Sequence, residues 1–174
     1  MINFIHRGIE ESTVMSNNTF SGLEMLKIAM LMEEEGYNLY KTGAENTSGK
    51  TKEFLLAASG QEFHHKEKFA KLYNELAASK EDESEYLYDD QVSGYLRAMI
   101  ENQVFNKNED LADAFKDLKS AAKKSLETEE LTVKVYTEMY KGVTGEAEKE
   151  IMARIIEEEK QHVEYFRNLL GEIE

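Results

Sequence analysis

The sequence predicts an all-α fold: a four-helix bundle made of two repeated helical hairpins, joined by a long crossover that carries a short extra helix. Three observations predict it. The 174 residues include no proline, and the helix-forming residues Glu, Lys, Leu, Ala and Met dominate. Apolar residues recur every three or four positions in four long segments, as on one face of a helix. The first two of these segments also match the last two in pattern.

Two stretches are expected to lie outside the main helices. Residues 1–20 show no sustained period and are expected to form an N-terminal extension or loop. Residues 78–110 form an acidic crossover, in which "QVSGYLRAMIENQVF" at 91–105 predicts the short extra helix. Because no low-complexity linker interrupts the pattern, a single bundle domain is expected over residues 21–174.

The first hairpin begins with a capping signal. Ser21 and Glu24 form a capping box, which predicts a helix start at this point. The apolar stripe of this helix runs from Leu26 to Tyr40, and the segment "NTSGK" ends it. A second helix is expected to begin near Ser48.

The second hairpin repeats this pattern. A helical run is expected from near Asp110, with Asp117 as a new N-cap. The segment "KGVTG" separates this run from the last helix. Leu55 in the first hairpin matches Met152 in the second, 97 positions later, and the neighbouring stripe residues match at the same shift. The chain is therefore predicted to contain a duplicated hairpin.

Each of the four apolar stripes is interrupted near its middle by a glutamate. In the second and fourth helices a histidine follows that glutamate by three residues and so lies on the same helix face. The interrupting residues are Glu33, Glu62 with His65, Glu129, and Glu159 with His162. Four buried carboxylates would be costly alone, whereas two divalent cations would balance their charge. Two Glu and two Glu-x-x-His pairs form the ligand set of di-iron and di-manganese bundles, so the pattern predicts two metal ions, which can be iron or manganese.

Other polar residues are expected to be ordinary. His64 is rotated about 100° from its neighbour His65 and is predicted to face solvent. The remaining acidic runs, including "IIEEEK" apart from Glu159, are predicted to be solvated helix faces.

Composition excludes several classes of function. The net charge of −14 argues against partners that are nucleic acids or anionic membranes. The absence of cysteine excludes thiolate metal sites and thiol nucleophiles. No apolar run approaches the roughly 20 residues of a membrane helix. We therefore expect a soluble cytoplasmic protein.

The segments "LKIAMLMEEEGYNLY", "SGQEFHHKEKF", "SLETEELTVKVYTEMY" and "IIEEEKQHVEYF" resemble the rubrerythrin branch of the ferritin-like superfamily. The resemblance covers about residues 21 to 170. It implies a non-haem di-iron centre, with Glu62 and Glu159 bridging the irons and Glu33 and Glu129 as terminal ligands. It also implies an oxidoreductase that reduces hydrogen peroxide or dioxygen and so counters oxidative stress.

Two departures from the family bear on this activity. A cysteine-containing rubredoxin domain is absent from this sequence, so electrons are expected from an external donor such as a rubredoxin-like protein. Thr132 stands where rubrerythrins place an additional glutamate, which leaves a rubrerythrin-type peroxidase cycle without that carboxylate. A homodimer is expected, although the sequence does not fix the oligomeric state. Two alternatives stay open: a ferroxidase or iron-handling protein, and a non-enzymatic metal-binding or structural bundle.

Overall fold

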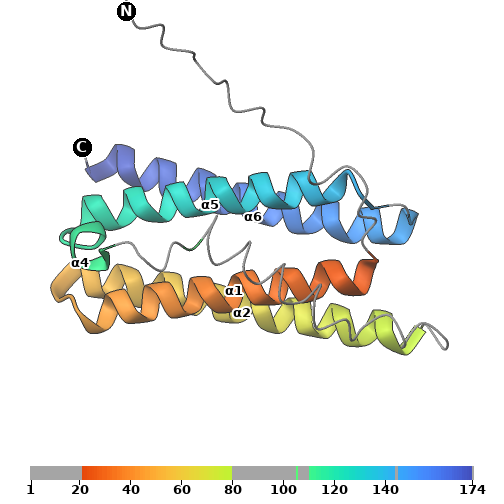
Figure 1. Cartoon of the computed structure of the whole chain (residues 1–174). Helices are drawn as coiled ribbons and strands as arrows, with labels where there is room; N and C mark the ends of the chain where they lie inside the picture. Colours follow the sequence, from red (N-terminus) through yellow and green to blue (C-terminus); the bar gives the residue numbers. More distant parts are fainter. Residues whose placement is uncertain (1–20, 80–104, 106–109, 144, 174) are drawn as a thin grey trace, which may run out of the picture.

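The computed structural model describes residues 21–79, 105, 110–143 and 145–173 (Figure 1). Their helices are α1 (Gly22–Glu45), α2 (Gly49–Ser79), α4 (Leu111–Ala114), α5 (Leu118–Tyr140) and α6 (Glu146–Ile173). Figure 1 shows α1 beside α2 and α5 beside α6, with the two pairs facing each other along their length. The predicted all-α bundle of two hairpins is confirmed. The predicted extension at 1–20 lies outside the described residues, as does the predicted helix at 91–105 apart from Phe105.

Both predicted helix starts have the expected caps. The Ser21 hydroxyl accepts a hydrogen bond from the Glu24 amide at 3.2 Å, and the Glu24 carboxylate accepts one from the Ser21 amide at 2.8 Å. In the second hairpin the Asp117 carboxylate accepts from the Ser120 amide at 2.7 Å. Asp110 caps the short helix α4 in the same way, through the Ala112 amide. Each cap satisfies an amide that the helix itself leaves free.

Two glycines shape the connections before α2 and α5. Helix α2 starts at Gly49, whose φ of 59° lies in the left-handed region that glycine adopts without strain. Near the end of α1, Gly43 lets the ring of Phe115 approach closely, because a Cβ atom there would lie 2.5 Å from the ring. Phe115 is buried and fixes the connection before α5 against the first hairpin.

The apolar core is divided into two clusters. One cluster joins the first half of α1 and of α6 to the second half of α2 and of α5, and includes Met25, Phe69 and Met152. The other occupies the opposite end of the bundle and includes Leu55 and Phe166. The residues midway along all four helices lie between these clusters. No helix in the described part of the chain is long and apolar enough to cross a membrane.

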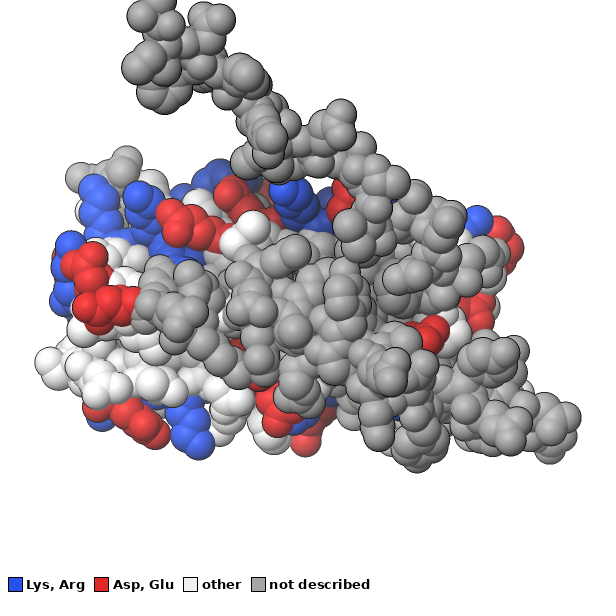
Figure 2. Space-filling model, viewed as in Figure 1, with Lys and Arg blue, Asp and Glu red and all other residues white. Residues whose placement is uncertain are grey.

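The surface carries both signs of charge. On the face shown in Figure 2, acidic and basic side chains lie close to one another over the visible helices. Several form ion pairs between residues three or four apart, such as Glu138 with Lys141 at the end of α5 and Glu150 with Arg154 in α6. These exposed pairs contribute little to stability. Four other acidic side chains, by contrast, lie buried inside the bundle.

Candidate metal centre

Four glutamates lie buried at the middle of the bundle, one on each long helix. Their exposed fractions are 2% for Glu33, 7% for Glu62, 3% for Glu129 and 1% for Glu159. A buried carboxylate is destabilising unless it is protonated, paired or bound to a cation. Four of them at one level therefore need positive charge or protons between the helices.

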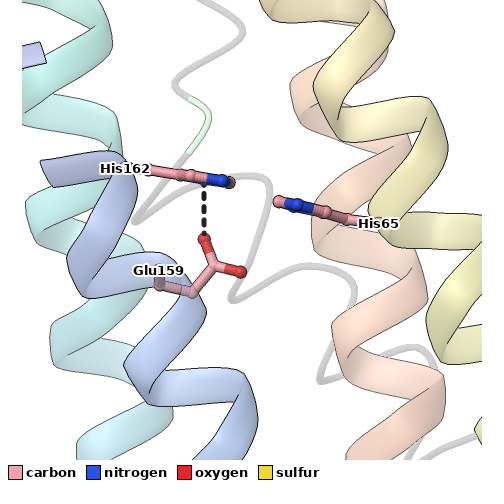
Figure 3. Close-up of side chains that lie close together, drawn as sticks. All are labelled: His65, Glu159 and His162. Atoms are coloured by element: carbon pink, nitrogen blue, oxygen red, sulfur yellow. Dashed lines mark ion pairs between the residues drawn. The ribbon is translucent and has the colours of Figure 1, made fainter. Parts of the chain in front are cut away.

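Two histidines complete this group and bring the hairpins into contact. The rings of His65 and His162 stack with centroids 4.5 Å apart and an interplanar angle of 4° (Figure 3). His65 Nδ1 lies 3.7 Å from Glu33 Oε2, and His162 Nδ1 lies 3.8 Å from Glu129 Oε2. His162 Nδ1 also lies 3.5 Å from Glu159 Oε2. The six residues predicted as ligands thus lie together, whereas His64 is exposed as expected.

Several buried atoms of this group lack hydrogen-bond partners among the described residues. They are Glu33 Oε2, His65 Nδ1 and Glu159 Oε1. Buried polar atoms nearly always have a hydrogen-bond partner, so the lack of one at these three atoms indicates that they bind a further group. Glu33, Glu62 and His65 offer ligand atoms within 4.8 Å of one another, and so do His65, Glu159 and His162. Carboxylate and imidazole donors at this spacing fit first-row divalent cations.

Burial and mutual repulsion govern the protonation of the carboxyl groups. Burial, reinforced by the charge of Glu159, raises the pKa of Glu33 well above its usual range. Burial and the charge of Glu129 raise the pKa of Glu62 in the same way. Burial also raises the pKa of Glu129, although His162 opposes the shift. Without a cation these carboxyls therefore tend to hold protons.

The pKa values of the two histidines are shifted in opposite directions. Burial disfavours the charged form of His162, but its contacts with Glu129 and Glu159 outweigh this effect and raise its pKa to about 10. For His65 burial and the nearby charge of His162 lower the pKa. In the metal-free chain the raised pKa favours an imidazolium at His162, which balances part of the charge of Glu129 and Glu159. Coordination of a metal by His162 would displace this proton.

Two tyrosines border the cluster at matching positions. Tyr40 on α1 and Tyr136 on α5 are completely buried, and their hydroxyls lack hydrogen-bond partners in the described part of the chain. Burial and the charge of Glu129 raise the pKa of Tyr40, and burial and the charge of Glu33 raise that of Tyr136. Each is thus a neutral phenol close to a carboxylate of the opposite hairpin.

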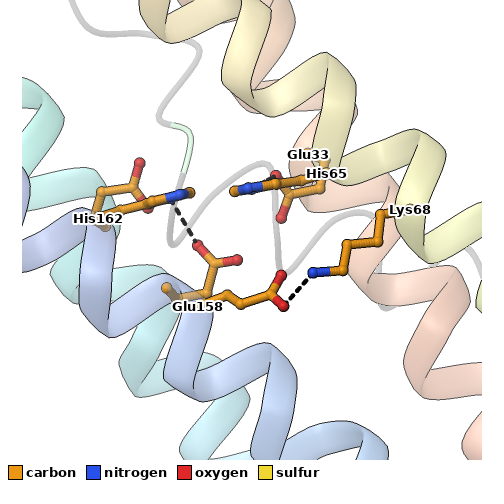
Figure 4. A network of polar contacts seen from close by, with 7 residues as sticks. Glu33, His65, Lys68, Glu158 and His162 are labelled. Atoms are coloured by element: carbon orange, nitrogen blue, oxygen red, sulfur yellow. Dashed lines mark hydrogen bonds and ion pairs between the residues drawn. The ribbon is translucent and has the colours of Figure 1, made fainter.

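Two features of the centre escaped the sequence analysis. Gly36 makes room for Glu62, since a Cβ atom at position 36 would lie 3.1 Å from Glu62 Cδ. Glu158, expected on a solvated face, instead pairs with Lys68 of α2 and has one buried carboxylate oxygen (Figure 4). The spacing of Glu158 four residues before His162 was the available signal, because it places both on one side of α6.

A comparison with protein families identifies the family of this chain. The family model described as Rubrerythrin matches residues 24–170. The chain belongs to the rubrerythrin family. This is a family of ferritin-like di-iron proteins, in agreement with the bundle and with its central carboxylates and histidines. No curated protein and no solved structure gives a significant match to this rubrerythrin-family chain.

Proposed function

We propose that the chain is a non-haem di-iron oxidoreductase that reduces hydrogen peroxide, or dioxygen, with electrons from an external donor. One observation carries the proposal. Four buried carboxylates and two imidazoles from matching positions of two hairpins meet at one level of the bundle, with buried atoms that lack partners. Membership of the rubrerythrin family supports iron as the metal.

The proposed ligands divide between the hairpins. Glu33, Glu62 and His65 would hold one ion, and Glu129, Glu159 and His162 the other, with Glu62 and Glu159 shared between them. The four carboxylates would balance the charge of two divalent ions. Such a pair supplies two electrons at one place, as the cleavage of an oxygen–oxygen bond requires.

The surrounding residues would orient the centre and limit its access. The apolar clusters at either end exclude water from the bundle along its length. The two imidazoles are 18% and 15% exposed for His65 and His162, against 1–7% for the glutamates. A small substrate would therefore approach from the side on which the histidines lie. Tyr40 and Tyr136 can donate hydrogen bonds to the carboxylates from within the core.

The decisive experiment is metal analysis of anaerobically purified chain beside a Glu62→Ala/Glu159→Ala double variant. We expect about two irons per chain in the wild type and a loss of both in the double variant. Stopped-flow oxidation of the reduced protein by peroxide and by dioxygen then identifies the preferred substrate. A folded wild-type chain that binds neither Fe²⁺ nor Mn²⁺ would sink the proposal.

Iron handling is a second candidate, and Thr132 favours it. This residue is buried at the position where the family's additional glutamate is expected, so the chain lacks that carboxylate. A ferroxidase would oxidise Fe²⁺ as its substrate, with dioxygen or hydrogen peroxide as the electron acceptor, and release the ferric product. Storage of the product requires a hollow oligomer. Light scattering that gives a large cage supports iron storage, whereas a dimer that oxidises iron for a limited number of turnovers supports the oxidoreductase.

A further inference from the structure

An ion pair lies beside the two stacked histidines. Lys68 Nζ contacts Glu158 Oε1 and so joins α2 to α6, which belong to different hairpins (Figure 4). The other oxygen, Glu158 Oε2, is buried and has no hydrogen-bond partner among the described residues. An exposed surface ion pair does not explain a buried carboxylate oxygen of this kind.

The position of Glu158 puts it at the edge of the candidate metal centre. It precedes His162 by four residues on α6, and Lys68 follows His65 by three residues on α2, so both flank the imidazole stack. Figure 4 shows Glu158 and Lys68 beside the rings of His65 and His162, which belong to opposite hairpins.

The repeat shows that this feature belongs to one side of the centre. A shift of 97 positions relates Glu158 to Gln61 and Lys68 to Tyr165. Gln61 and Tyr165 are both exposed, and neither carries a carboxylate or an ammonium group. The duplicated hairpins thus supply six matching candidate ligands and one additional carboxylate.

We propose that, when the two ions are trivalent, the Glu158 carboxylate leaves Lys68 and binds the metal pair as a seventh protein ligand. This inference rests on the proposed di-metal site. Four carboxylates balance two divalent ions, whereas two trivalent ions carry two further positive charges. Glu158 can place one more negative charge beside them, whereas Thr132 carries no carboxylate. Its buried, unpartnered oxygen is the atom that is free to bind.

The test compares divalent and trivalent probes that are inert to redox chemistry under the conditions used. The metal-free full-length chain is titrated with Co²⁺ and, separately, with Ga³⁺ supplied as its nitrilotriacetate complex. For Glu158→Gln we expect Ga³⁺ affinity to fall about tenfold or more, with Co²⁺ affinity within about twofold of wild type. Glu157→Gln is the matched control, because Glu157 lies next in the chain, is exposed and pairs only loosely with Lys160 at 3.9 Å.

The variant Lys68→Met tests whether Glu158 binds metal or acts only as a clamp, that is, as a structural link between the hairpins through its ion pair with Lys68. If Glu158 binds metal, removal of its competitor leaves Ga³⁺ affinity unchanged or increases it. Equal losses of Ga³⁺ affinity in Lys68→Met and Glu158→Gln would show a clamp and overturn the inference, as would wild-type Ga³⁺ affinity in Glu158→Gln. A wild-type chain that binds neither probe overturns the proposed di-metal function as well. Circular dichroism of each variant shows that its helices are intact.

Discussion

The hairpins α1–α2 and α5–α6 can be compared position by position, because matching residues are 96 or 97 places apart. The candidate ligands lie alike in both. Glu33 is 3.7 Å from His65 in the first hairpin, and Glu129 is 3.8 Å from His162 in the second. The repeat therefore preserves the distances between the groups that would bind metal.

The surroundings of these groups are not preserved. The buried residues around Glu33 in α1 lack hydroxyl groups. The residues at the matching positions around Glu129 in α5 have them. The three pairs are Ala29 and Ser125, Met32 and Thr128, and Gly36 and Thr132. The second half of the centre is therefore the more polar one. Duplication has kept the donor atoms while their environment has diverged, so the two proposed ions would occupy unequal sites.

The largest predicted difference concerns the two histidines in the metal-free chain at pH 7. His162→Ala removes the cation that pairs with Glu129 and Glu159, and we expect a loss of about 3 kcal/mol in the free energy of unfolding. His65→Ala removes a ring whose charged form is disfavoured, and we expect about 1 kcal/mol. Urea denaturation followed by circular dichroism measures both. Equal losses would show that the hairpins are electrostatically equivalent.

The sequence predicts those features of the fold that depend on neighbouring residues. The caps at Ser21 and Asp117 need only a side chain and an amide two or three positions later, and both form as predicted. The meeting of the four glutamates and two histidines also follows from local periodicity, because a stripe residue must face the core of a bundle.

Contacts between helices distant in the chain could not be predicted in this way. Glu158 belongs to the acidic run "IIEEEK", which was predicted to face solvent apart from Glu159. Its ion pair with Lys68 depends on the packing of α6 against α2, which the local sequence does not reveal. The charge of His162 likewise depends on Glu129 of another helix. Gly36 leaves room for the Glu62 carboxylate, and this role follows only from the packing of α1 against α2.

A second prediction concerns the stability of the metal-free chain between pH 5 and 9. The pKa values of Glu33, Glu62 and Glu129 are raised from 4.5, and that of His162 from 6.5 to about 10. The folded chain therefore binds more protons than the unfolded chain in this range, and its stability falls as pH rises. The lowered pKa of His65 acts in the opposite direction, with an effect complete by about pH 6.5.

We expect a net fall of at least about 2 kcal/mol, measured by urea denaturation across this range of pH. His162→Ala should remove the part of the fall above pH 6.5, whereas His65→Ala should leave it in place. Saturation with Co²⁺ should reverse the trend, because metal binding releases the same protons. A metal-free chain that becomes more stable between pH 7 and 9 would contradict the assigned charge of His162.

A third, smaller effect is expected from the matching positions 36 and 132. In Gly36→Ala the new Cβ atom lies 3.1 Å from Glu62 Cδ, so the carboxylate must move, and we expect Co²⁺ affinity to fall about tenfold. Thr132→Ala removes atoms instead of adding them, and a change below about threefold is expected. Competition with a coloured chelator measures both affinities. Equal affinities in the two variants would mean that Glu62 adapts without loss of binding.

The smallest effects are expected from the buried tyrosines, and they test the polarity difference directly. Tyr40→Phe and Tyr136→Phe each remove a buried hydroxyl without a hydrogen-bond partner, which should leave the metal-free chain as stable or up to about 1 kcal/mol more stable. Ser125 lies near Tyr40, where its hydroxyl counteracts the raised pKa, whereas its counterpart Ala29 has no hydroxyl. Tyr40→Phe should therefore stabilise the chain more in a Ser125→Ala background than in the wild type. If Tyr40→Phe has the same effect in both backgrounds, the Ser125 hydroxyl does not contribute to the inequality of the two halves.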